Sequence, residues 1–389
     1  MADFSAFKQR PCPDWFARPQ LGIFIHWGVF AIPAWAPRGP SITELIRTDY
    51  DNLFTLAPYA EWYENALRIA HSPTRAHHAA RWGRRTYDSF ALDFEREAAA
   101  FDAEAWVDLF EEAGASYVVF VAKHHDGYCL WPTDIANPRR AAWRSQRDYV
   151  GELATATRAR GLRFGVYYSG GLDWTFQNRP ITDFGSMMAC VPLDDAYADY
   201  AEAQVRELID RYAPSILWND IAWPDESRLP GLFAHYYATV PDGVVNDRWQ
   251  GNRALFQNLQ TAEGLEAFNT YLKARLAAHE GELGQPPPPH CDFRCAEYAD
   301  GRNLGGGKWE STRGIGLAFG YNANERAEDH LTGEGLIALY GDVTGRGGNL
   351  LINVGPMADG TIPPIQTAPL RALGATIRSE EAAPDRPLR

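Results

Sequence analysis

Eight short apolar runs recur along the chain, and segments with helical spacing of apolar residues separate most of them. Near-continuous apolar runs of this length are typical of strands buried on both faces of a parallel sheet. The predicted strands are Leu21–His26, Tyr117–His124, Arg163–Tyr168, Ile216–Asp220, Val244–Arg248, Phe293–Tyr298, Gly316–Tyr321 and Asn349–Val354. The periodic segments between them predict helices over Asp102–Glu112, Tyr149–Arg158, Tyr197–Tyr212 and Leu336–Val343.

Strand–helix alternation repeated about eight times predicts a (β/α)₈ barrel. A doubly wound sheet, with five to six repeats, is the competing architecture. The barrel is favoured because polar residues stand at the C-terminal end of nearly every predicted strand, where such barrels build their active sites. These residues are His26, His124, His125, Asp126, Tyr167, Tyr168, Asp220, Asp247, Arg248 and Glu297. We therefore predict one shared site at this end.

Composition narrows the class of protein. Of the 389 residues, 46% are hydrophobic and 22% are charged, as in an ordinary globular protein. The net charge of −13 disfavours nucleic-acid partners, which select basic surfaces. No run approaches the roughly 20 apolar residues of a membrane helix, and residues 1–10 contain no apolar export signal. With five scattered cysteines, we expect free thiols and a cytoplasmic location.

The strand-end residues combine carboxylates, histidines and an arginine with many indoles, since the chain has 13 tryptophans. The glycine run 305–307 before Lys308 lacks the outer glycine and hydroxyl of a phosphate-binding loop, and no serine nucleophile elbow occurs. A metal-dependent sugar isomerase is an alternative, but the adjacent His124 and His125 would point to opposite sides of a strand. Paired carboxylates with aromatic residues favour glycoside hydrolysis.

Several long motifs, in a defined order along the chain, resemble those of a known protein family. They are Leu21–Gly28, Pro58–Tyr63, Ala122–Trp131, Gly165–Trp174, Leu217–Pro224, Val245–Trp249, Lys308–Glu310, Arg313–Gly316 and Gly347–Gly355. Together they resemble the family 29 glycoside hydrolases, the α-L-fucosidases. The resemblance runs from about residue 15 to about residue 365 and implies a (β/α)₈ catalytic barrel.

The resemblance implies a role for each matching carboxylate. Asp220 matches the nucleophile of the family, and a nearby arginine would favour its ionised form. Glu297 matches the acid/base, for which Glu61 and Glu310 are the rivals. A retaining mechanism then predicts that the carboxylates of Asp220 and Glu297 lie about 5–5.5 Å apart.

The resemblance also implies a fucose-binding site and its partner, a fucosylated oligosaccharide or glycoconjugate. Trp218 and Phe319 would form an apolar floor beneath the methyl group of the sugar, although Phe319 could instead be a core residue. No metal or organic cofactor is implied. The substrate-binding residues are His26, Glu61, Trp62, His124, His125, Tyr167, Trp218, Arg248 and Phe319. The alternatives are hydrolysis of a related sugar such as an α-L-galactoside, a metal-dependent sugar isomerase, and a barrel that binds sugar without cleaving it.

Two departures from the family pattern affect the domain assignment. We assign residues 1–365 to the catalytic barrel and residues 366–389 to a C-terminal helix with a frayed tail. The usual C-terminal β-sandwich of about 100 residues would not fit after Val354. The second departure is an inserted segment at residues 250–289, between the fifth and sixth strands.

The insertion predicts a helix over Asn258–Glu280, followed by a stiff return over Gly281–Pro289 that contains four consecutive prolines. Its apolar stripe is Leu265, Phe268, Leu272 and Leu276. The segment is either a longer connector, which packs on the barrel's own helices, or a wall on the leaving-group side that also contacts a second subunit. The second interpretation predicts a homo-oligomer.

Overall fold

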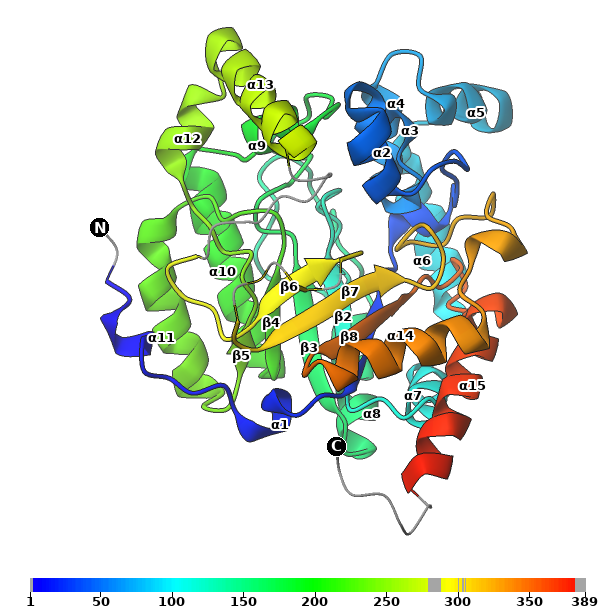
Figure 1. The fold of residues 1–389 in the computed structure, drawn as a ribbon. Coiled ribbons are helices and arrows are strands. Elements are labelled where there is room, and N and C mark those ends of the chain that lie inside the picture. The colour runs from blue at the N-terminus through cyan, green and yellow to red at the C-terminus, as the bar shows by residue number, and fades with distance from the viewer. Residues whose placement is uncertain (1–2, 279–287, 300, 303, 305, 382–389) are drawn as a thin grey trace.

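A computed structural model describes residues 3–278, 288–299, 301–302, 304 and 306–381. Its eight strands form one parallel sheet in the order β5-β4-β3-β2-β1-β8-β7-β6 (Figure 1). This order is the cyclic order of an eightfold barrel, so the predicted (β/α)₈ architecture is confirmed. The strands are β1 (Leu21–Ile25), β2 (Tyr117–Lys123), β3 (Arg163–Tyr168), β4 (Ile216–Asn219), β5 (Val244–Val245), β6 (Arg294–Glu297), β7 (Trp309–Gly314) and β8 (Asn349–Val354).

The barrel has a seam between β5 and β6. Within the described ranges no backbone ladder joins these two strands. Aspartate groups bridge them instead: the backbone N–H of Asp292 donates to the Val245 carbonyl at 2.9 Å, and the Val245 N–H donates to Oδ2 of Asp292 at 2.8 Å. The N–H of Cys295 donates to Oδ1 of Asp247 at 3.1 Å. Side chains therefore close the barrel at the place where the strands are shortest.

Helices surround the sheet and extend beyond the C-terminal ends of its strands. Several begin at capping side chains, as when Asp102, Asp148 and Asp194 accept an N–H from the first helical turn. The helices are α1 (Asp14–Ala17), α2 (Ile42–Thr48), α3 (Leu53–Leu56), α4 (Tyr63–Arg68), α5 (Pro73–Trp82), α6 (Phe90–Glu97), α7 (Ala103–Glu112), α8 (Tyr149–Ala159), α9 (Phe184–Ala189), α10 (Asp195–Tyr212), α11 (Leu229–Thr239), α12 (Arg253–Asn258), α13 (Ala262–Ala278), α14 (Gly333–Gly345) and α15 (Pro364–Glu381). In the described parts of the chain, none is both long and apolar enough to cross a membrane.

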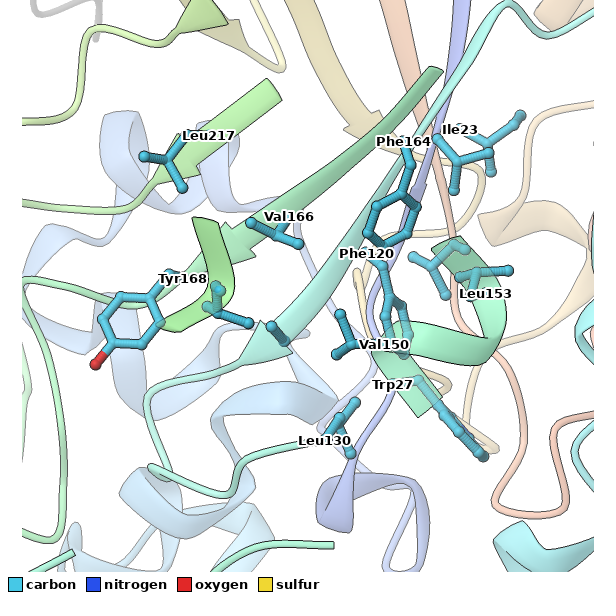
Figure 2. Packing of buried hydrophobic residues seen from close by; sticks show 14 of the residues in the cluster. Ile23, Trp27, Phe120, Leu130, Val150, Leu153, Phe164, Val166, Tyr168 and Leu217 are labelled. Atoms are coloured by element: carbon cyan, nitrogen blue, oxygen red, sulfur yellow. The ribbon is translucent and has the colours of Figure 1, made fainter. Parts of the chain in front are cut away.

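The main core lies between the strands and the helices around them. Strand residues that alternate outward, such as Phe120 and Phe164, pack against Val150 and Leu153 of α8 (Figure 2). The inward-facing residues form a second, aromatic-rich cluster inside the barrel. Its members include Phe16, Phe24, Tyr117, Tyr167, Trp218 and Phe293. This inner cluster is the floor on which the candidate site rests.

The prediction of the seventh strand is wrong. Residues Gly316–Tyr321 form a loop, and the strand is the more polar segment Trp309–Gly314. The apolar character of the loop has another cause, because Ala318 and Phe319 are buried over the mouth of the barrel. The fifth strand is also shorter than predicted, since only Val244–Val245 of Val244–Arg248 pairs with β4.

The inserted segment contains two helices where one was predicted. The chain turns after α12, and Oγ1 of Thr261 accepts the N–H of Gly264 at 3.0 Å to start α13. Helix α13 contacts α9 and α2 of its own chain, at the upper end of the molecule in Figure 1. Its stripe is only partly covered there: Leu276 is buried, and Leu265, Phe268 and Leu272 are half-buried.

Contact of α13 with a second subunit stays a prediction. Most of the predicted proline-rich return lies outside the described residues, as does the tail after Glu381. The predicted C-terminal helix is α15, which begins at Pro364 and contacts α7 and α14.

Candidate active site

One arginine joins two carboxylates at the C-terminal end of the barrel. Arg248, which follows β5, donates from Nη1 to Oδ1 of Asp220 at 2.9 Å and from Nη2 to Oε2 of Glu297 at 2.8 Å. Burial alone would lower the pKa of the Arg248 guanidinium, but the carboxylates of Glu297 and Asp220 raise that pKa well above its usual value. The two carboxylates are thus held beside one permanent positive charge.

Asp220 directly follows β4, and both of its oxygens are engaged. Oδ1 also accepts the backbone N–H of Ile221 at 2.8 Å, and Oδ2 accepts the hydroxyl of Tyr167 at 2.8 Å. Ile221 adopts a left-handed backbone conformation with φ of 67°, which bends the chain sharply after the strand. These donors stabilise an ionised carboxylate in a fixed orientation.

Glu297 lies at the end of β6, nearer to solvent than Asp220. The exposed fraction of the side chain is 30% for Glu297 and 15% for Asp220. The hydroxyl of Tyr59 donates to Oε1 of Glu297 at 3.4 Å. Glu297 therefore combines an anchored position with access to the mouth.

The two rival glutamates are fully committed to other partners. Glu61, 1% exposed, accepts the backbone N–H groups of Phe319 and Gly320 at 3.4 and 2.8 Å. Glu310 is 0% exposed, and hydroxyl and indole donors occupy both of its oxygens. Both oxygens of each of these glutamates are therefore engaged. Among the three candidates Glu297 is the one with a partly exposed side chain, and its role as the acid/base stays a prediction.

In two histidines, His26 and His125, one ring nitrogen carries no proton. The hydrogen-bond partners of each ring determine which nitrogen that is. Oδ1 of Asn353 accepts from Nδ1 of His26 at 2.7 Å, because the amide nitrogen of Asn353 donates to the Phe319 carbonyl. Ser169 donates its hydroxyl to the Leu172 carbonyl, so Nδ1 of His125 must donate to Oγ of Ser169 at 2.6 Å. Nε2 of each neutral ring is then an acceptor.

Burial keeps these rings neutral. It lowers the pKa of His26 to about 3 and of His125 to about 3, and it holds the pKa of His124 well below its usual value. Nε2 of His125 lies 3.8 Å from Oδ2 of Asp220. Nδ1 of His124 has no hydrogen-bond partner in the described part of the chain. Such groups are suited to bind the hydroxyls of a sugar.

Aromatic rings complete the site. Trp218 stacks on Tyr167 with ring centroids 5.5 Å apart, and Phe319 lies 4.9 Å from the ring of His26. Trp62, which begins α4 as its N-cap, meets the ring of His125 edge-on at 5.1 Å. The structure thus brings every predicted substrate-binding residue to the same end of the barrel.

Three of the polar strand-end residues serve other purposes. Asp126 accepts the hydroxyl of Tyr87, Tyr168 donates to Gln204 on α10, and Asp247 bridges the barrel seam. Sequence reasoning also missed Tyr59, Ser169 and Asn353, which hold Glu297, His125 and His26. Their only signal was their position within the quoted motifs. Among the described residues, the site included, no three His, Cys, Asp or Glu side chains group as a metal site would require.

Comparisons with known proteins agree with this site. The family model described as Alpha-L-fucosidase matches residues 2–381. An α-L-fucosidase of Dictyostelium discoideum is 30% identical over 374 residues, covering 92% of this chain and 68% of that protein. Human tissue α-L-fucosidase is 28% identical over 384 residues, covering 96% of this chain and 69% of that protein.

The fold comparison gives the same result. The crystal structure of Thermotoga maritima α-fucosidase in complex with a mechanism-based inhibitor has a TM-score of 0.79 and 42% sequence identity. The match covers 97% of this chain and 77% of that one. From the family match, the identities and the shared fold, the chain belongs to the α-L-fucosidase family.

Proposed function

We propose that this chain hydrolyses terminal α-L-fucosides of oligosaccharides or glycoconjugates with retention of the anomeric configuration. The observation that carries the proposal is the pair of hydrogen bonds from Arg248, which we call the Arg248 clamp. Nη1 donates to Oδ1 of Asp220 at 2.9 Å, and Nη2 donates to Oε2 of Glu297 at 2.8 Å. Family membership supplies the substrate class, and the paired carboxylates supply the chemistry.

In the first step, Asp220 attacks the anomeric carbon of the fucoside. Tyr167, Arg248 and the N–H of Ile221 hold its carboxylate ionised and aimed. Glu297, in its protonated form, donates its proton to the departing glycosidic oxygen. The bond from the anomeric carbon to that oxygen breaks as an ester with Asp220 forms.

In the second step, Glu297 acts as the base. It takes a proton from a water molecule that attacks the anomeric carbon, and the ester bond to Asp220 breaks. Because each step inverts the anomeric carbon, fucose leaves with the configuration of the substrate. The partial exposure of Glu297 supports this role, since the leaving group and the water both arrive from the mouth.

The binding site fits a 6-deoxy sugar. Nε2 of His26 and of His125 would accept sugar hydroxyls, while Trp218 and Phe319 offer an apolar surface to the methyl group. An apolar surface rejects an added hydroxyl by only about 10²-fold. We therefore expect α-L-galactosides, which carry that hydroxyl, to be slow substrates.

The test is a kinetic panel with an aryl α-L-fucoside, the matching α-L-galactoside and fucosylated oligosaccharides. We expect rapid release of the aryl group from the fucoside, with α-fucose as the first anomer in proton NMR, and full activity in EDTA. Release of β-fucose first would refute retention. Loss of activity in EDTA would support the metal-dependent alternative, and tight binding without turnover would support the sugar-binding one.

A further inference from the structure

A buried carboxyl that the proposed mechanism does not use lies inside the barrel. Glu310, on β7, is 0% exposed. The hydroxyl of Tyr117 on β2 donates to its Oε2 at 2.6 Å, and Nε1 of Trp218 on β4 donates to its Oε1 at 3.1 Å. Glu310 thus connects three strands across the barrel interior, beneath the floor of the site.

Burying a carboxyl group at this position costs free energy. Removing it from water carries a large desolvation cost, and burial raises the pKa of Glu310 to about 7. An apolar side chain would fill the same volume without that cost. The hydrogen bonds of Glu310 are specific, however, because an indole N–H can donate in only one direction. The carboxyl therefore distinguishes one orientation of the Trp218 ring from the others.

The orientation of Trp218 matters to both groups that hold Asp220. Tyr167, which donates to Asp220, stacks on the indole with an angle of 23° between the planes. The guanidinium carbon of Arg248 lies 5.2 Å from the centre of the same indole. The ring of Phe24, on β1, packs against the indole with ring centroids 5.2 Å apart. A rotation of the indole would disturb the stack and the clamp together.

We propose that Glu310 is a positioning residue, which fixes the plane of Trp218 and through it the aim of Asp220. Without an acceptor for its N–H, the indole can rotate about the bond that joins it to Cβ, a torsion with broad minima. Small displacements of a reacting group cost large factors in rate, about 10²-fold for 1 Å. This inference rests on the proposed function for its kinetic readout, but the indole itself can be observed directly.

Substitutions of Glu310 and Tyr117 can distinguish a residue that orients Trp218 from one that only fills the barrel interior. E310M removes the acceptor at similar volume, and E310Q retains an oxygen that can accept the indole N–H. The matched control is Y117F, which removes the other hydrogen bond of the same carboxyl and leaves Trp218 its acceptor. The double variant of E310M with Y117F spares the hydroxyl from burial without a partner, in case E310M alone folds poorly.

The kinetic expectation is a fall of about 10²-fold in kcat/KM on the aryl fucoside for E310M, with kcat reduced more than KM is raised. E310Q and Y117F should stay close to the unaltered chain. W218F keeps a flat ring but has no N–H to orient. In the W218F background, E310M should therefore have little further effect, and equal losses in both backgrounds would overturn the proposal.

The second readout is the indole N–H resonance of Trp218 in ¹H–¹⁵N NMR, identified by its absence in W218F. We expect it to shift in E310M and to remain in place in Y117F. An unshifted resonance in folded E310M overturns the proposal whether or not the chain cleaves fucosides. If the unaltered chain cleaves no fucoside while the resonance shifts as expected, the proposed function fails and the contact between Glu310 and Trp218 stands.

Discussion

The two halves of the barrel are closed by different means. On one side, β1, β2, β3, β7 and β8 are five to seven residues long and paired by backbone ladders. On the other side, β4, β5 and β6 have two to four residues, and asparagine and aspartate side chains replace much of the ladder. The amide of Asn246, for example, bonds both the N–H and the carbonyl of Asn219, at 3.0 and 2.8 Å.

The two halves also carry different parts of the site. The histidines lie at the ends of the laddered strands β1 and β2, whereas Asp220, Arg248 and Glu297 end the short strands. Backbone ladders thus support the histidines proposed to bind the sugar, and side chains support the groups proposed to react. Substitutions in the short half should therefore change rate more than stability, and substitutions in the laddered half should do the reverse.

The largest effect should come from Asp220 in the short half. D220G removes the proposed nucleophile, so we expect turnover of an aryl fucoside to fall by about 10⁴-fold or more. Azide should partly restore the rate by occupying the vacated space. D225N, a nearby carboxylate that caps a turn, is the control and should keep its rate. Near-normal turnover in D220G would refute the assignment.

In the laddered half, the sharpest test is the buried ion pair of Lys123 and Asp173. Nζ of Lys123 lies 2.8 Å from Oδ2 of Asp173, and both side chains are 0% exposed. K123M leaves the carboxylate without its cation, so we expect the free energy of unfolding to drop by about 3–5 kcal/mol in denaturant titrations. Adding D173L should recover much of that loss. Unchanged stability in K123M would contradict the division between the halves.

Arg248 provides the matching test in the short half. R248K retains the positive charge, but an ammonium cannot span two carboxylates as the planar guanidinium does. We expect kcat/KM to fall by about 10²-fold, or about 2.7 kcal/mol, with little change in the denaturation midpoint. R253K, a change at a half-buried arginine that begins α12, is the matched control. A large loss of stability with an unchanged rate would reverse the interpretation of this half.

The smallest predicted effect is a dependence of stability on pH through Glu61. Burial raises the pKa of Glu61 from 4.5 to about 7, so the folded chain binds a proton more tightly than the unfolded chain. The free energy of unfolding should therefore fall as pH rises, with a contribution of about 2 kcal/mol from Glu61 between pH 5 and pH 7. E61Q should lack this contribution, and E263Q, an exposed change on α13, should retain it. Identical pH slopes in all three chains would refute the assignment.

Much of the fold could be predicted because buried parallel strands produce apolar runs. The exception, β7, shows the limit of that signal. Glu310 points into the barrel and is satisfied by Tyr117 and Trp218, so the strand reads as polar. The following loop reads as apolar because Phe319 lines the mouth. A single sequence contains no record of which distant side chains will satisfy a buried carboxyl.

The site was predicted as a set of residues but not as a geometry. Motif positions placed Asp220, Glu297 and Arg248 at neighbouring strand ends, which the structure brings together. That one guanidinium spans both carboxylates depends on side-chain conformations, which spacing does not determine. The protonated nitrogen of His26 likewise depends on Asn353, more than three hundred residues away.

The barrel seam also explains where the chain could lengthen. The connection from β5 to β6 crosses the only strand boundary in the described residues that lacks a backbone ladder. A connection several times longer raises the loop-closure cost by only about 1–2 kcal/mol, and no ladder register has to be preserved. Residues 250–289 therefore lie where a segment can be exchanged without disturbing the sheet. Exchange of this segment between fucosidases should transfer the architecture of the mouth, while the strands that orient the carboxylates stay unchanged.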